Sequence, residues 1–382
     1  MLRPALVGLA VFVVALSTTI PMPLYTAYAG RSGAGAGGLA LAFVAYAGTV
    51  IVTAPLLGAL SDRIGRKPCM ILGLLLAGLS ILLLIITPNL TALGIARMMQ
   101  GLATGVIAGA GTAWAAELGM SGARAAGITA AGTAGGFGVG GLMTLGALLL
   151  APEAEPPFTY WLHLALSAVA LAGVAALPET RSGPRGAWFR LPAFPRGTLA
   201  TTLGMLPAWG TTGVMLTAIP AALAAQGSPR TGPFAVCVMI LVGVLVQQFL
   251  RGVAARRAVL TGLALMAFGD ALAVWGTLSG GVALLLLGGA VIGSAAYGFL
   301  FLGGLSAASS AALPENRARA AAGFFLVAHI GFAVPPLLTG LAVDAFGAGV
   351  ALPGHALAVT LFSLALAPFL RRQPLAGAER RG

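Results

Sequence analysis

The stretch GALSDRIGRKP, Gly58–Pro68, concentrates charge in a chain that carries very little of it. It contains Asp62, Arg63, Arg66 and Lys67, whereas only 8% of the 382 residues are Asp, Glu, Lys or Arg. Long apolar runs lie on both sides, LAFVAYAGTVIVTAPLL before it and CMILGLLLAGLSILLLII after it. Such a pattern is typical of a short loop between two membrane-spanning helices.

The composition of the whole chain indicates that lipid surrounds most of it. Hydrophobic residues make up 59% of the sequence and the mean hydropathy is +0.99. A soluble domain carries roughly 25% charged residues, and no fold with water on every side can cover so much apolar surface. We therefore expect an all-α integral membrane protein. Cys69 and Cys237 have no metal-ligating neighbours in the sequence, so we expect no metal site.

Twelve runs of the sequence are long and apolar enough to cross a bilayer. A spanning helix needs about 20 mostly apolar residues, and the glycines and prolines that interrupt many of these runs are tolerated in membrane helices. The expected spans are, approximately, residues 5–27, 38–60, 69–87, 91–115, 125–150, 158–178, 199–225, 232–250, 258–278, 280–312, 319–343 and 350–370.

The positions of the basic residues test this count and indicate the orientation. If both termini are cytoplasmic, eighteen of the 21 Lys and Arg residues fall in inside segments, and the outside segments hold Arg31 and Arg230. Cytoplasmic loops of membrane proteins carry such an excess. The net charge of +12 is thus a topology signal and not a nucleic-acid patch. We expect a multi-pass protein of the cell membrane whose surroundings are the lipid bilayer, with no nucleic-acid partner.

The chain is expected to fold as two related halves. Residues 181–198 form the longest inside loop, which is basic and rich in Pro and Gly. We therefore expect a six-helix bundle over 1–180, a cytoplasmic linker over 181–198, and a second six-helix bundle with a short cytoplasmic tail over 199–382. Segments 124–144 and 319–339 share eight identical residues at an offset of 195. This repeat predicts twelve helices in two pseudo-symmetric bundles, with the fifth span corresponding to the eleventh.

The chain resembles transporters of the major facilitator superfamily over its whole length, and three motifs carry the resemblance. The first, which fits the signature loop of that superfamily, is Gly58-x-Leu60-x-Asp62-Arg63-x-Gly65-Arg66-Lys67. The second, in span four, is Arg97-x-x-Gln100-Gly101. The third, in span five, resembles a motif of the drug:proton antiporter branch: Gly132-x-x-x-Gly136-Phe137-x-x-Gly140-Gly141. The antiporter motif has Pro where this chain has Phe137, and span one lacks the acid that many of those antiporters carry.

The resemblance implies a secondary transporter that works by alternating access on a small-molecule substrate. It also implies a monomer without a cofactor, with protons as a partner. We expect proton-coupled efflux of small hydrophobic or cationic compounds. The alternative is uptake or export of a metabolite, such as a sugar or an organic acid, by symport or uniport. No cluster of acids, histidines or metal ligands recurs at one depth, so we do not expect an enzyme.

The charged loop is expected to be a cytoplasmic gate. Acids contribute little to topology, so Asp62 requires a reason beyond orientation. The resemblance implies that the loop helps to lock the two halves together on the cytoplasmic side, with Asp62 bound to a nearby base or helix N-terminus. Gly65 permits a tight turn. The residues of this gate motif are Gly58, Asp62, Arg63, Gly65, Arg66 and Lys67.

Ionisable residues at membrane depth are candidates for coupling, because burying a charge there costs about 3 kcal/mol. Arg97 shares a helix face with Gln100, one turn later; the alternative is a structural role in which Arg97 bonds carbonyl groups of span one. Asp270 lies near the middle of span nine and His329 in the middle of span eleven, and for both the alternative is a packing role. Two further histidines are expected at the outer ends of spans: His163 and His355.

Substrate contacts are expected from polar and aromatic residues of spans one, four, seven and ten, which form the cavity in the fold that the resemblance implies. The candidates are Thr19, Tyr25, Gln100, Trp209, Thr212 and Tyr297. The glycine motif of span five adds a further group: Gly132, Gly136, Gly140 and Gly141.

Overall fold

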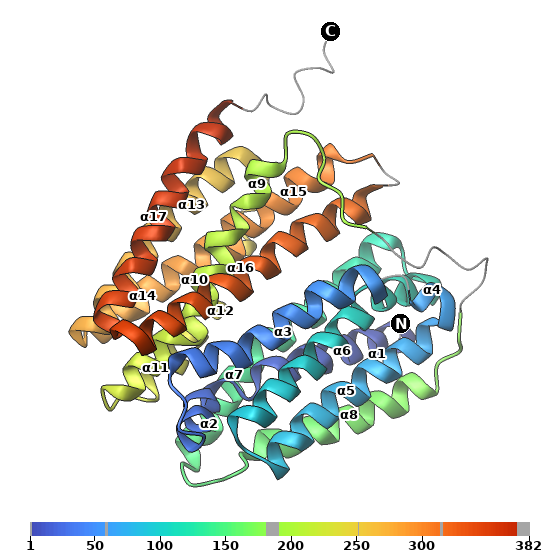
Figure 1. The fold of residues 1–382 in the computed structure, drawn as a ribbon. Coiled ribbons are helices and arrows are strands. Elements are labelled where there is room, and N and C mark those ends of the chain that lie inside the picture. The colour runs from blue at the N-terminus through green and yellow to red at the C-terminus, as the bar shows by residue number, and fades with distance from the viewer. Residues whose placement is uncertain (1, 58–59, 181–190, 251, 314–315, 373–382) are drawn as a thin grey trace. The chain divides into compact units, whose positions relative to one another are not determined.

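The protein is helical throughout the part of the chain that the structure, a computed structural model, describes (Figure 1). The described residues are 2–57, 60–180, 191–250, 252–313 and 316–372. They fall into two compact units, Met1–Arg190 and Leu191–Gly382. Residues 181–190 of the expected linker and 373–382 of the expected tail lie outside the described residues, as does Gly58 of the gate motif.

The described residues of the N-terminal unit form eight α-helices and a short 3-10 turn. Helix α6 begins at an N-cap residue, Asn89, whose side chain accepts a hydrogen bond from the Ala92 amide at 2.9 Å. The elements are α1 (Leu2–Thr19), η1 (Met22–Leu24), α2 (Tyr25–Arg31), α3 (Ala36–Leu57), α4 (Ser61–Ile64), α5 (Arg66–Ile86), α6 (Leu90–Glu117), α7 (Gly122–Leu150) and α8 (Phe158–Ala175).

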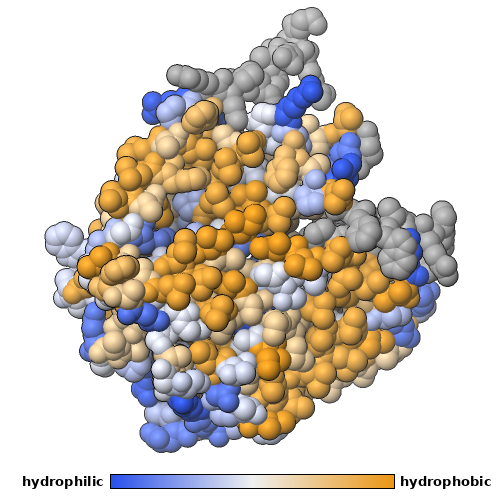
Figure 2. Space-filling view, viewed as in Figure 1, coloured by the Kyte–Doolittle hydropathy of each residue, from blue (hydrophilic) through white to orange (hydrophobic). Residues whose placement is uncertain are grey.

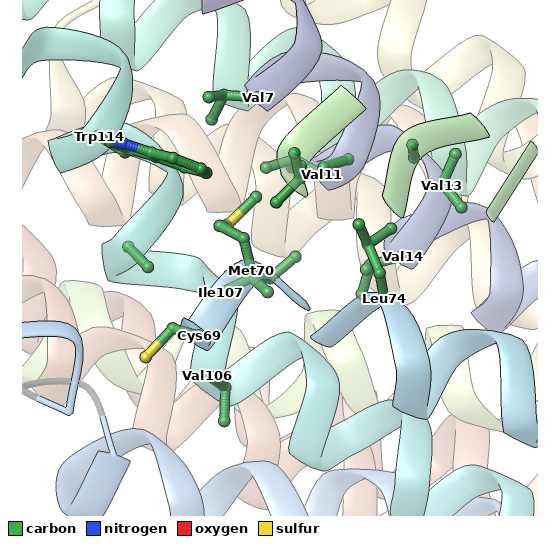
Figure 3. Packing of buried hydrophobic residues seen from close by; sticks show 14 of the residues in the cluster. Val7, Val11, Val13, Val14, Cys69, Met70, Leu74, Val106, Ile107 and Trp114 are labelled. Carbon is green, nitrogen blue, oxygen red and sulfur yellow. The ribbon is translucent and has the colours of Figure 1, made fainter. Parts of the chain in front are cut away.

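The core of the N-terminal unit lies where α1, α5 and α6 meet (Figure 3). Val7, Val11 and Val14 recur at helical spacing on α1 and pack with Met70 of α5 and Trp114 of α6. Lipid tails are as apolar as these side chains, so the contact is stabilised by close van der Waals packing more than by removal from water. The fit between helices therefore decides how firmly this unit holds together.

In the part of the C-terminal unit that the structure describes, there are nine α-helices and one π-helical segment. Helix α13 packs against α14 and α17, α12 packs against α14, and α10 packs against α16. The elements are α9 (Leu199–Leu203), α10 (Met205–Leu216), α11 (Ala218–Ala225), α12 (Thr231–Gln247), α13 (Ala255–Ser279), α14 (Val282–Gly293), η2 (Ser294–Leu300), α15 (Phe301–Ala311), α16 (Arg317–Phe346) and α17 (Ala348–Arg372).

Eleven helical stretches of the described residues are long and apolar enough to cross a membrane, and a twelfth apolar helix, α12, is shorter. Many large hydrophobic side chains are exposed on the protein surface, among them Ile86, Leu150, Trp275 and Phe369. In the view of Figure 2, hydrophobic residues cover much of the visible surface. Both observations agree with lipid as the solvent of these helices.

Three of the spans are interrupted. The first breaks after Thr19, where Pro21 and Pro23 each lack the amide that a continuous helix requires. The seventh is divided into α9, α10 and α11, and the tenth contains the π-helical segment η2 between α14 and α15. The tenth run of the sequence is longer than the others expected here, and in the structure it is one continuous helical stretch, Val282–Ala311. Such irregular segments in membrane helices frequently occur at functional sites.

Candidate functional site

Four buried polar side chains of the N-terminal unit surround the break in the first span. We call them the Arg97 cluster: Arg97, Gln100, Tyr25 and Thr18. Arg97 is 3% exposed and Gln100 is fully buried. Arg97 Nη1 donates to the Thr18 carbonyl at 3.0 Å and to Gln100 Oε1 at 3.2 Å. Gln100 Nε2 donates to the Ser17 carbonyl at 2.9 Å. The two side chains on α6 thus bind backbone groups of α1.

The prolines of the first span explain why those carbonyls need partners. In an unbroken helix the Ser17 carbonyl would accept from the amide of residue 21, and Pro21 has no such amide. The chain turns away at the same point, so the Thr18 carbonyl is also available, and the Tyr25 hydroxyl donates to it at 3.4 Å. A buried carbonyl without a donor costs about 1–3 kcal/mol. Arg97 and Gln100 supply the missing donors, as the structural alternative for Arg97 predicts.

The Arg97 guanidinium is also enclosed by aromatic rings. Its central carbon lies 4.6 Å from the ring centre of Tyr46, 5.0 Å from that of Phe43 and 5.8 Å from that of Tyr25. Each such contact contributes about 0.5–2 kcal/mol, more when water is excluded. Among the described residues, no carboxylate forms an ion pair with Arg97. The N-terminal unit therefore stabilises this buried cation with carbonyls and rings.

The span-five glycines lie along the contact between α7 and α1. A Cβ on Gly132 would lie 2.7 Å from the Gly8 carbonyl oxygen, and one on Gly136 would lie 2.5 Å from the Phe12 carbonyl oxygen. Gly140 faces α1 in the same way, at the Leu16 carbonyl. Thr19, a cavity candidate, donates its hydroxyl to the Gly136 carbonyl at 3.2 Å. Gly141 follows on the same helix. The motif thus permits two helix backbones to approach closely.

The gate motif forms a network of charges within the N-terminal unit. Arg66 Nη1 bonds Asp62 Oδ1 at 2.5 Å and Ser61 Oγ at 2.6 Å. Arg66 Nη2 bonds Glu117 Oε1, at the end of α6, at 3.0 Å. Asp62 thus has its base one turn away in its own loop. Arg63 lies on α4 and is half-buried.

The end of the first half folds back onto this loop. The Glu179 carboxylate accepts from the backbone amides of Arg66 and Lys67, each at 3.0 Å, and so caps the N-terminus of α5. Lys67 Nζ donates to the carbonyls of Ala175 and Leu177 at the end of α8. Gly65 has φ 109° and ψ 160°, a conformation that L side chains rarely adopt, and a Cβ there would lie 2.9 Å from the Glu179 carboxylate carbon.

Replacing Glu179 with alanine is expected to destabilise the N-terminal unit by about 1–2 kcal/mol, because two amides at the start of α5 lose their acceptor. The measurement is the apparent Tm of the detergent-solubilised protein. Glu153→Ala is the matched control, since Glu153 is an exposed acid in the loop before α8. Equal melting temperatures for the two variants would contradict the capping role.

A second buried polar group lies in the C-terminal unit; we call Asp270, His355, Thr211 and Thr339 the Asp270 cluster. Asp270 is fully buried on α13, and its Oδ2 lies 3.6 Å from Nε2 of His355 on α17. Thr211 of α10 and Thr339 of α16 each contact the His355 ring at 3.3 Å. Four helices therefore bring their polar residues to one point inside this unit.

The aromatic and polar candidates of spans seven and ten lie beside the π-helical segment. Trp209 of α10 meets the ring of Tyr297 at 5.0 Å between centroids and that of Phe332 at 5.6 Å. The Tyr297 carbonyl, within η2, accepts from Gln247 Nε2 at 2.9 Å. Thr212 is buried and donates to the Ala208 carbonyl of its own helix at 2.9 Å. Trp209 and Tyr297 are thus in contact, as neighbouring cavity residues would be.

Two further histidines lie inside their units. His163 is fully buried and its Nε2 lies 3.1 Å from the Val13 carbonyl of α1, and His355 is 8% exposed within the Asp270 cluster. Polar groups of facing helices accommodate both rings, and their position near the outer ends of their spans stays a prediction. His329 Nδ1 lies 2.7 Å from the Phe325 carbonyl one turn earlier in its own helix.

Sequence reasoning did not identify Glu179 or His355 as members of these groups. Glu179 closes the sequence Leu-Pro-Glu directly after the last span of the first half, and its position beside a basic inside loop was the available signal. His355 lies 16 residues beyond Thr339, on the following helix, α17. The sequence does not indicate that the packing of α17 against α13 brings His355 to Asp270. Both contacts depend on tertiary packing.

The comparisons with known proteins agree with this architecture. The family model of the Major Facilitator Superfamily matches residues 7–255. The solved structure of the nucleoside transporter NupG is similar with a TM-score of 0.75 at 13% identity, over 97% of this chain and 99% of that one. A bacterial homolog of the human lysosomal transporter Spinster, in an inward-facing and occupied conformation, gives a TM-score of 0.69 at 14% identity, over 97% of both chains.

At these identities the similar structures establish the fold alone. They cover nearly the whole chain, and the family model covers more than half of it. The expected all-α membrane fold with twelve helices is confirmed. The chain belongs to the Major Facilitator Superfamily of transporters.

Proposed function

We propose that this transporter moves a small polar metabolite, neutral or anionic, across the cell membrane by proton-coupled alternating access. The observation that carries the proposal is the charge of Arg97. This buried base lies on the helix face that contacts the broken first span, and among the described residues no carboxylate is paired with it. A substrate that approaches the Arg97 cluster therefore meets positive charge.

The sign of that charge discriminates between substrate classes. Two like charges 4 Å apart repel by about 4 kcal/mol at an effective dielectric constant of 20, which corresponds to a loss of nearly a thousandfold in affinity. A cationic compound is disfavoured by this amount near Arg97, whereas a carboxylate is attracted and a neutral polar compound is not affected. Tyr25 and Gln100 add hydrogen-bonding groups at the same place.

The remaining features agree with a metabolite carrier. The fold is shared with a nucleoside transporter, so this scaffold is compatible with a polar neutral substrate. Trp209 and Tyr297 offer rings on which a sugar or a base can stack. We further propose that the protein acts as a monomer with both termini in the cytoplasm, and that its gate motif closes the cytoplasmic side.

Proton-coupled efflux of hydrophobic or cationic compounds is the second candidate. It rests on the resemblance of the span-five glycine motif to the antiporter branch. The close approach of α7 to α1 gives Gly132, Gly136 and Gly140 a packing reason that does not involve the substrate. We therefore place metabolite transport first.

The test uses the purified protein in proteoliposomes with an imposed pH gradient. A panel of radiolabelled nucleosides, sugars, organic acids and lipophilic cations is offered, and exchange and gradient-driven accumulation are measured for each compound. We expect transport of a neutral or acidic compound and none of the cations. Transport restricted to lipophilic cations would overturn this proposal in favour of efflux.

Asp62→Asn should reduce the transport rate while leaving the protein folded, because Arg66 loses one of its two carboxylate partners and keeps the other, Glu117. The exposed Glu153→Gln is the control for removing one acid. Transport at the wild-type rate in Asp62→Asn would refute the gate.

A further inference from the structure

The carboxylate of Asp270 is enclosed in the C-terminal unit with few groups able to neutralise it. Its side chain has no exposed surface, and neither of its oxygens has a hydrogen-bond partner among the described residues. The closest charged or titratable group is the His355 ring, with 3.6 Å between Oδ2 and Nε2. An ionised carboxylate is strongly disfavoured in such a place unless a positive charge pairs with it.

The helices around Asp270 provide no other charge at that depth. Within the described residues, α9, α10, α11, α14 and α15 carry no Asp, Glu, Lys, Arg or His, and η2 carries Tyr297, whose ring is in contact with Trp209. The arginines of α13 and α17 lie at helix ends, where Arg256 donates to the Arg371 carbonyl and Arg257 is exposed. The titratable groups of α16, which packs against α17 and α10, are Arg317, Arg319, His329 and Asp344.

Proton counting then defines the state of the pair. With one proton, Asp270 and His355 are either a neutral acid beside a neutral imidazole or a carboxylate beside an imidazolium, and both arrangements have zero net charge. Removing that proton leaves a buried negative charge, and adding a second leaves a buried positive charge. The pair is therefore suited to hold one proton in this conformation, and to release it when the surroundings of the pair change.

The cluster is connected to a helix that carries substrate candidates. Thr211 Oγ1 lies 3.3 Å from His355 Nε2, the same nitrogen that faces Asp270. Thr211 belongs to α10, the middle segment of the broken seventh span, and two residues before it is Trp209. A change in the protonation of His355 therefore alters a contact of the helix that positions Trp209.

Among the described residues of the N-terminal unit, this pair has no counterpart. At the repeat offset of 195, His355 corresponds to Tyr160, whose hydroxyl bonds that of Tyr28 at 2.6 Å. Two phenols form a neutral hydrogen bond there. The two halves are thus chemically different at this position, although their helices repeat.

We infer that Asp270 and His355 together bind the coupling proton of the transport cycle, with Thr211 relaying its presence to α10. This inference rests on the proposed function, since it assigns the proton of that cycle to a site. It places the coupling site on α13 and α17, apart from the Arg97 cluster.

The direct test is the number of protons released by the purified, detergent-solubilised protein when the solution is titrated from about pH 6, where ordinary carboxyl groups have already lost their protons, to alkaline pH. We expect wild-type protein to release one proton more than Asp270→Asn. Thr277→Val is the matched control, since Thr277 is buried on the same helix and donates to the Ala273 carbonyl of that helix; it should match the wild type. Equal proton counts for wild type and Asp270→Asn would overturn the inference.

A second variant keeps the test decisive if Asp270→Asn does not fold. In His355→Gln the proton can reside on Asp270 alone, so the infrared spectrum must show the carbonyl band of a protonated carboxylic acid. The chain has nine acidic residues, so few other carboxyl groups contribute to that region. Absence of the band, or its loss on adding sodium chloride at constant pH, would overturn the inference; the second result would indicate a sodium site.

Transport by the same variants separates this inference from the proposed function. Asp270→Asn should retain substrate exchange and lose proton-driven accumulation at least tenfold, because exchange requires no net proton movement. If Asp270→Asn keeps both substrate exchange and proton-driven accumulation, the coupling role is overturned. If wild-type protein transports no metabolite of the panel, the proposed function fails, and the proton count still decides whether the site exists.

Discussion

Adding a single methyl group at Gly136 is expected to destabilise the protein by about 1–3 kcal/mol, and a valine there by more, to the point of losing the folded protein. The Cβ would lie 2.5 Å from the Phe12 carbonyl oxygen, 2.6 Å from Ala15 Cβ and 2.8 Å from the Leu16 amide nitrogen. Two of these three atoms belong to the backbone of α1, so no rotamer change relieves the clash. The two helices would have to move apart along a contact that holds the unit together without help from the hydrophobic effect.

Gly138 supplies the matched control on the same helix. A Cβ at this position meets nothing within 4 Å, so Gly138→Ala should be neutral or should stabilise α7 by up to about 1 kcal/mol through its helix propensity. The measurement is the yield of monodisperse protein in detergent and its apparent Tm for the Ala and Val variants at both positions. Equal losses at Gly136 and Gly138 would show that the α1–α7 contact does not depend on this glycine.

Replacing Arg97 with leucine is expected to leave the protein folded and to reduce transport at least about tenfold. The Thr18 carbonyl loses its best donor, at a cost of about 1–3 kcal/mol, while leucine avoids the about 3 kcal/mol that a charge costs at membrane depth. Stability is therefore nearly unchanged. The break in the first span loses the group that fixes it, and a change of about 1.4 kcal/mol in the barrier already alters the rate tenfold.

Two controls assign the cause of that loss. Arg97→Lys keeps the charge but not the planar guanidinium that lies against the rings of Tyr25, Phe43 and Tyr46, so partial transport should remain if charge attracts the substrate. Met98→Leu changes the next residue, which is 46% exposed, and should have no effect. The measurement is the initial rate of exchange in proteoliposomes, normalised to folded protein. A wild-type rate in Arg97→Leu would exclude any role of this residue in transport.

The charged loop Gly58–Pro68 could be recognised without a structure, but its contacts could not. Asp62, Gly65 and Arg66 were predicted as parts of one gate, because their types and spacing match a known motif. The structure shows that Glu117, at the end of α6, and Glu179, shortly after α8, both reach Arg66. No local pattern joins residue 66 to residue 179, since the contact depends on how α8 returns to the start of α5.

The sequence by itself determined the membrane environment, the number of spans, the family and the residues with a functional motif, because these depend on composition, on run length and on the charges between runs. Only the tertiary structure decided which buried groups meet. It brought Arg97 to the carbonyls released by Pro21, and it brought His355 to Asp270. The reason is physical: a polar group inside lipid must find its partner across helices, and the face that each helix presents is set by packing and not by the order of residues along one span.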